Sequence, residues 1–132
     1  MKLKKLLENN TDFKINLEEI DNISDSDILK GIAENNPDYR FRLKAVERIF
    51  DDDFLKDLIY SDSNRNVKIS AVSNLKSQSF LENIAKNHTD CHVRIEAIEK
   101  MHDISSLERI CQIESNKKVK KVIMERIDQL ND

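Results

Sequence analysis

Apolar residues recur along the chain at intervals of 26 residues. The pattern is clearest in one stretch, which contains Val93, Arg94, Ala97, Ile98 and Met101. One interval earlier the same positions carry Val67, Lys68, Ala71, Val72 and Leu75, and two intervals earlier Phe41, Arg42, Ala45, Val46 and Ile49. Weaker copies lie at both ends of the chain. The sequence therefore predicts five repeats, approximately residues 1–26, 27–52, 53–78, 79–104 and 105–132.

A second group of apolar positions precedes the first in every repeat. It begins with a leucine, at Leu3, Leu29, Leu55, Leu81 and Leu107. Further apolar residues follow three and four positions later, as at Leu58 and Ile59. Spacings of i, i+3 and i+4 place side chains on one face of a helix. Each repeat is therefore predicted to contain a first helix of about two turns and a longer second helix of about three turns.

Polar residues mark the expected helix ends. Each second helix is preceded by a side chain that can accept hydrogen bonds from free N–H groups at a helix start: Asp12, Asp38, Asn64, Asp90 and Asn116. Asn9, Asn35 and Asn87 are expected to close first helices, because Asn tolerates a left-handed backbone. Helix pairs this short must stack to bury their apolar faces. We therefore predict an all-α fold, an α-solenoid, as a single domain over residues 1–132.

A basic or amide residue lies inside the apolar arc of each second helix. The basic members of this column are Arg42, Lys68, Arg94 and Lys120. A charge in such a place is costly unless it is paired. The helix-start residues lie four positions earlier on the same face, so we predict a structural ladder in which the basic column pairs with Asp38, Asn64, Asp90 and Asn116. A row of phosphate-binding side chains is the alternative.

The segment DCHVRIEAIEKM, residues 90–101, resembles the second helix of HEAT-like repeats. It is most similar to the short repeats of the phycobilisome-lyase type, with the pattern D-x-x-V-R-x-x-A, and weaker copies begin at Asn64 and Asp38. The resemblance covers nearly the whole chain. Because the unit is shorter than the roughly 40 to 47 residues of ordinary HEAT repeats, the leucine-rich-repeat variant is a second possibility. The resemblance implies that the second helix lines the inner, concave surface of the stack.

The outward arc of the second helices is the predicted partner-binding face. We call this the second-helix face, and it consists of Arg40, Lys44, Glu47, Arg48, Asn66, Ser70, Ser73, Asn74, His92, Glu96, Glu99 and Lys100. Acidic and basic side chains alternate along it. Such a mixture is typical of a solvated surface or of a groove that binds a polar protein partner.

Composition and charge exclude several classes of protein. Charged residues make up 36% of the chain and the net charge is −3, which is not the basic balance of a nucleic-acid-binding protein. The single glycine, Gly31, excludes glycine-rich phosphate loops and dinucleotide fingerprints. The longest apolar runs are far shorter than the roughly 20 residues of a membrane span, and no apolar export signal follows Met1. We expect a cytoplasmic protein that is not an enzyme and has no cofactor.

Two clusters carry chemistry that could be functional. His88, Cys91 and His92 do not have the spacing of ligands on one helical face, so we expect no metal site there, and Cys111 is expected to be a buried small hydrophobe. The lysines Lys117, Lys118, Lys120 and Lys121 open the last helix. We interpret them as a soluble end of the array, with binding of phosphate or an acidic partner as the alternative.

The sequence thus favours a protein-binding or scaffold module, expected to be a monomer, that presents the second-helix face to a protein partner. A nucleic-acid-binding protein that uses the Arg and Lys columns is one alternative. A lyase-like helper of a cofactor-carrying protein, suggested by the resemblance, is the other.

Overall fold

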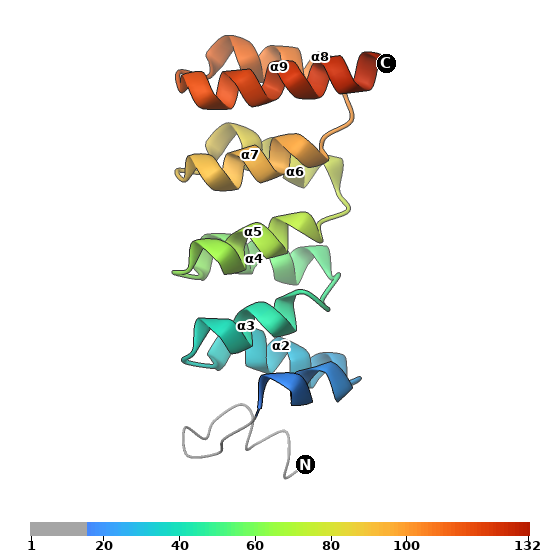
Figure 1. Ribbon diagram of the computed structural model, residues 1–132, viewed down its shortest axis with the longest axis vertical. Coiled ribbons are helices and arrows are strands. Elements are labelled where there is room, and N and C mark those ends of the chain that lie inside the picture. Colours follow the sequence, from blue (N-terminus) through green and yellow to red (C-terminus); the bar gives the residue numbers. More distant parts are fainter. Residues whose placement is uncertain (1–15) are drawn as a thin grey trace. The chain divides into compact units, whose positions relative to one another are not determined.

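The 26-residue interval of the sequence reappears in the positions at which the helices begin. The computed structural model describes residues 16–132. Its first helices are α2 (Ser26–Asn35), α4 (Asp52–Ser61), α6 (Gln78–Asn87) and α8 (Ile104–Ile113). Its second helices are α3 (Tyr39–Val46), α5 (Arg65–Ser73), α7 (Cys91–Lys100) and α9 (Lys117–Asn131), and a short 3₁₀ helix, η1 (Leu17–Asn22), precedes them. Figure 1 shows first and second helices alternating along the chain.

Every second helix from α3 onward begins where the sequence predicts. The side chains of Asp38, Asn64, Asp90 and Asn116 each accept a hydrogen bond from the backbone N–H two residues later, at 2.9 to 3.0 Å. Each of these residues has an extended backbone, as an N-cap requires. The predicted first helix of residues 1–26, with Leu3, Asn9 and Asp12, lies outside the described residues.

The prediction that second helices are longer than first helices holds only in the last repeat, where α9 has 15 residues and α8 has 10. All four first helices have 10 residues, whereas α3 has 8 and α5 has 9. The first helices have this length because a second column of caps starts them, at Asp25, Asp51, Ser77 and Asp103. Like the caps of the second helices, they recur every 26 residues.

The proposed left-handed helix ends are also wrong. Helices α2 and α6 do end at Asn35 and Asn87, but no residue in 16–132 has a positive φ. The next residues, Asn36 and His88, are extended, and their N–H groups donate to Ile32 and Ile84. A regular i→i−4 hydrogen bond closes each helix, so no left-handed residue is needed.

The apolar columns form the core within each of two compact units, residues 1–74 and 75–132. In the first unit α2 packs on α3, α4 on α5, and α3 on both η1 and α5. In the second unit α6 packs on α7 and α8, and α9 on α7 and α8. The column Ala45, Ala71 and Ala97 is fully buried, as expected for small residues at close helix contacts. The described chain has an all-α helical repeat fold, as predicted.

Candidate functional site

In each repeat, the turn between the two helices contains a side chain that accepts a hydrogen bond at the same position. Asn36, Asp62, His88 and Glu114 occupy its first position. Each side chain accepts a hydrogen bond from the N–H of the helix cap two residues later, at 2.8 to 3.0 Å. Since His88 accepts through Nδ1, that nitrogen carries no proton. The turn therefore requires an acceptor of moderate length, which Asn, Asp, Glu and neutral His all supply.

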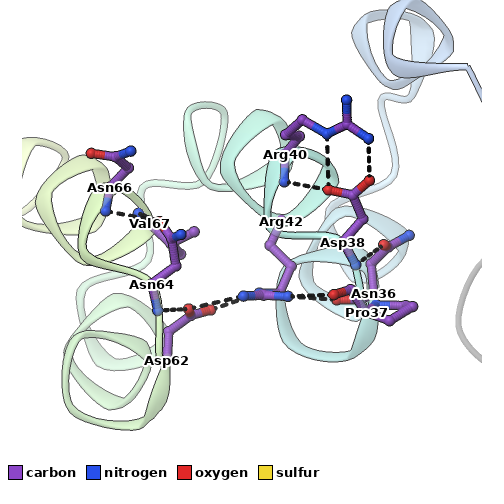
Figure 2. A network of polar contacts seen from close by, with 9 residues as sticks. All are labelled: Asn36, Pro37, Asp38, Arg40, Arg42, Asp62, Asn64, Asn66 and Val67. Carbon is purple, nitrogen blue, oxygen red and sulfur yellow. Dashed lines mark hydrogen bonds and ion pairs between the residues drawn. The ribbon is translucent and has the colours of Figure 1, made fainter.

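Two arginines of the basic column bind the carboxylates of the following turn. Nε and Nη2 of Arg42 donate to Oδ2 and Oδ1 of Asp62 at 2.9 and 3.2 Å, and Nη1 donates to the carbonyl oxygens of Asn36 and Pro37 (Figure 2). Arg94 makes the same contacts with Glu114, at 3.2 and 3.3 Å. All four side chains are nearly buried. Each arginine therefore joins its own turn to the next one through a two-pronged, charge-assisted contact.

This arrangement corrects the predicted ladder. Arg42 and Arg94 do connect neighbouring repeats, but their acidic partners are Asp62 and Glu114 rather than the helix caps. The cap Asp38 binds Arg40 instead, and the side-chain hydrogen bonds from Arg40 lower the pKa of the Asp38 carboxyl group. The remaining caps, Asn64, Asp90 and Asn116, accept from backbone N–H groups. The caps bind N–H groups at the helix starts. The acidic turn residues Asp62 and Glu114, two positions before a cap, pair with the arginines instead.

Each arginine contact borders a shallow groove. The groove beside Arg42 has a volume of about 430 Å³ and is lined by Glu34, Asp57, Ser61 and Ser63 among others. An equivalent groove of about 240 Å³ lies beside Arg94, with Lys86 and Ser115 in its wall. The two grooves occupy the same position in their repeats and different side chains line them. Their shared position follows from the repeat geometry.

Several residues of the predicted second-helix face are occupied by structural contacts. Arg48 donates from Nη1 to the carbonyl oxygen of Ile20. The amide of Asn74 donates to the carbonyl oxygens of Val46, Glu47 and Ile49, at 2.9 to 3.2 Å. These donors satisfy carbonyl groups at and just beyond the C-terminal end of the preceding second helix, or of η1. Arg48 and Asn74 therefore have structural roles, and their assignment to a partner-binding face stays a prediction.

Two further members of this face in the first unit form ion pairs. Arg40 binds Asp38, and Lys44 binds Asp21 in η1 at 3.2 Å. Glu47 and Asn66 are exposed, while Ser70 and Ser73 are half-buried. Arg40, Glu47 and Asn66 therefore remain exposed on the first-unit part of this face.

The second unit has a groove on the same face. It has a volume of about 380 Å³ and lies between α7 and α9, lined by Glu99, Val122, Glu125, Arg126 and Gln129. Of these, Glu99 belongs to the predicted face. Val122, Glu125 and Arg126 occupy its positions one repeat later, and Gln129 lies about one turn further along α9. In the sequence, Glu125 and Arg126 already continue the rows of Glu99 and Lys100, although the predicted face stops at Lys100. We call this the α7/α9 groove.

The α7/α9 groove is acidic. Arg126 is held by hydrogen bonds from Nε to the carbonyl oxygen of Met101 at 3.0 Å and from Nη1 to Gln129 at 3.2 Å. Glu99 and Glu125 are exposed. On the same face of α7, partial burial and then the neighbouring Glu99 raise the pKa of the Glu96 carboxyl group, against the opposing effect of Lys100. A cationic group that binds near Glu96 and Glu99 would relieve this repulsion.

The other residues that the sequence singled out in the second unit do not line the α7/α9 groove. His92 is half-buried in the first turn of α7, and Lys100 is exposed at its end. Cys111 is half-exposed and not buried, which corrects its assignment. In the part of the chain that the structure describes, no three His, Cys, Asp or Glu side chains converge as metal ligands would. None of the described helices combines the length and apolar character that crossing a bilayer requires.

Comparison with known proteins gives no match. No family model, no curated protein sequence and no solved structure is significantly similar to this chain.

Proposed function

We propose that the protein is a non-enzymatic protein-binding module of the HEAT-like kind, which binds a partner in the α7/α9 groove. The observation that carries this proposal is the position of the groove. It lies between two neighbouring second helices and contains Glu99 of the predicted face, with Val122 and Glu125 one repeat later. The HEAT-like assignment is supported by the Asp90 cap, Val93, Arg94 and Ala97 in their pattern positions, with Val93 and Ala97 fully buried.

The charge of the groove favours a partner segment with basic side chains. Glu96, Glu99 and Glu125 provide carboxylates on or beside it, and half-buried Val122 provides an apolar surface. Complementary potentials favour a partner segment with Lys or Arg side chains around an apolar residue. A nucleic acid is disfavoured, because its phosphates would face the carboxylates. Arg42 and Arg94, which would have to bind phosphate, are already engaged by Asp62 and Glu114.

Site-specific photo-crosslinking in a lysate of the source organism tests this proposal. A photoreactive residue replaces Gln129, which lines the groove, or Gln112, which is exposed on α8 and serves as the matched control. We expect one protein to crosslink at position 129 and not at position 112. Equal crosslinking at both positions would contradict the proposal.

A pair of charge reversals makes the test specific. Glu99→Lys alters the groove, whereas Glu108→Lys makes the same change of charge at an exposed position on α8. We expect Glu99→Lys to abolish the crosslink at position 129 and Glu108→Lys to preserve it. Titration of the purified partner then gives a dissociation constant, which should rise about tenfold or more with Glu99→Lys. An unchanged constant would show that the groove is not the binding site.

A further inference from the structure

One side of α9 combines three lysines, of which Lys120 is half-buried, with an exposed apolar residue. Lys117, Lys120, Lys121 and Met124 line a groove of about 400 Å³ together with Glu125 and Asp128. Met124 is 59% exposed, which is unusual for a large apolar residue in this chain. Within residues 16–132, the salt bridges involve none of these three lysines. We call this surface the α9 lysine face, and it differs from the α7/α9 groove.

The same side of the other second helices receives the following repeat. In the second unit, α7 packs on α9, and Arg94 reaches the turn residue Glu114 just before α9. In the first unit, α3 packs on α5, and Arg42 reaches Asp62 in the same way. Val46 and Ile98, which are the counterparts of Met124, are fully buried. This side of a second helix is thus shaped to pack against another helix pair with an acidic turn.

Helix α9 keeps both features of that contact, a basic residue and an apolar residue at the equivalent positions. Lys120 has the position of Arg42 and Arg94, and Met124 has the position of the buried Val46 and Ile98. Lys121 replaces the apolar Ile95 and adds a second positive charge. The neighbouring helix is also less covered here, because Cys111 is half-exposed while its counterpart Ala85 is fully buried.

We propose that the α9 lysine face binds an acidic amphipathic helix of a partner protein, which packs where a following repeat would lie. The apolar side of that helix would cover Met124, and its carboxylates would bind Lys117, Lys120 and Lys121. Continuity with the packing of α7 on α9 gives the geometry, and the excess of three lysines over two carboxylates gives the sign. A nucleic acid fits less well, because its phosphates would leave the exposed apolar side chain of Met124 uncovered.

Methyl NMR with ¹³C-methyl methionine tests this binding directly. Met124 reports on the face, and Met101, which is 2% exposed, serves as an internal control. The probe is a synthetic amphipathic peptide of Glu and Leu with about 18 residues, long enough for roughly five helical turns. A scrambled peptide of the same composition and a single-stranded oligonucleotide are the comparison ligands. We expect the amphipathic peptide to shift the Met124 signal and leave the Met101 signal unchanged.

Substitutions then assign the contact. Lys120→Glu combined with Lys121→Glu should raise the dissociation constant about tenfold or more, whereas Lys120→Arg with Lys121→Arg should preserve binding. Lys100→Glu with Lys118→Glu makes an equal change of charge at exposed lysines that do not line the α9 lysine face, and it should have little effect. An unshifted Met101 signal shows that each variant is folded.

Four results would overturn the proposal. These are no shift of Met124, an equal shift with the scrambled peptide, an equal shift with the oligonucleotide, or a shift that depends on protein concentration without peptide. The last result would assign the face to a second copy of the chain. Glu99→Lys should leave the peptide binding unchanged, so failure here is distinguishable from failure of the α7/α9 groove.

Discussion

The contact between Arg42 and Asp62 should be a major source of stability in the first unit. Removing the guanidinium with Arg42→Met leaves the Asp62 carboxylate, whose side chain is 4% exposed, without its countercharge. The carbonyl oxygens of Asn36 and Pro37 lose their donor in the same change. Breaking a buried ion pair from one side costs about 3 to 5 kcal/mol. The Arg42 side chain is 13% exposed, so we expect a value near the lower end, about 3 kcal/mol.

Urea unfolding followed by circular dichroism at 222 nm measures this loss. With an m-value of about 2 kcal/mol per molar urea, a loss of about 3 kcal/mol lowers the midpoint by about 1.5 M. The control is Arg40→Met, which removes an exposed ion pair with side chains 62% and 31% exposed. Exposed pairs contribute about 0 to 1 kcal/mol, so the control should shift the midpoint by about 0.5 M at most.

A double variant separates loss of charge pairing from loss of packing. Asp62→Asn keeps an acceptor for the N–H of Asn64, as Asn36 does at the equivalent position, and it removes the buried charge. Combined with Arg42→Met, it should recover about 1 to 2 kcal/mol of the loss, since neither partner then leaves a charge unpaired. The reasoning is refuted if Arg42→Met shifts the midpoint no more than Arg40→Met does, or if the double variant recovers nothing.

Three further predictions follow from the same contacts. Asn74→Ala removes three hydrogen bonds to carbonyl groups at the end of α3 and should destabilise the protein by about 1 to 2 kcal/mol in urea unfolding, while a change below the error would contradict its structural role. His88→Ala should lower the melting temperature, because the N–H of Asp90 loses its acceptor. His88→Asn keeps an acceptor and should lower the melting temperature much less. Equal decreases for the two variants would show that the acceptor is unimportant. The hydrogen bond from Lys30 lowers the pKa of Asp51 in the folded state, so this stabilisation is present above the ordinary carboxyl pKa and is lost as the pH falls through the folded value. The urea midpoint of the wild type should therefore fall more between pH 5 and about pH 2.5 than that of Asp51→Asn, and parallel curves would contradict this.

The helix starts could be predicted because caps are local. Asp38, Asn64, Asp90 and Asn116 each bind an N–H only two residues away, so the sequence alone contains both partners. The same rule would have located the starts of the first helices at Asp25, Asp51, Ser77 and Asp103. The regular interval of 26 residues was sufficient evidence for that second column.

The long-range partners could not be predicted in the same way. Helical periodicity placed Arg42 in an apolar arc and showed that it needed a carboxylate, but the partner lies 20 residues away in another turn. Arg48 lies only about 20° from half-buried Phe41 at 100° per residue, at the edge of the outward arc. Its long side chain bends over the helix end to the carbonyl oxygen of Ile20, which a projection around one helix does not show.

Residue-resolved amide hydrogen exchange tests the central claim, that a 26-residue interval sets the structure of the described chain. The account predicts slow exchange for the N–H groups that close each first helix, at Asn36, Asp62, His88 and Glu114, which donate to Ile32, Leu58, Ile84 and Ile110. It predicts fast exchange at exposed turn residues whose N–H groups do not close a helix. Ser63 and Ser115 are such residues, and they lie 52 residues apart, which is two intervals. Protection that repeats at this interval would support the account. Protection without this period, or confined to one of the two units, would contradict it.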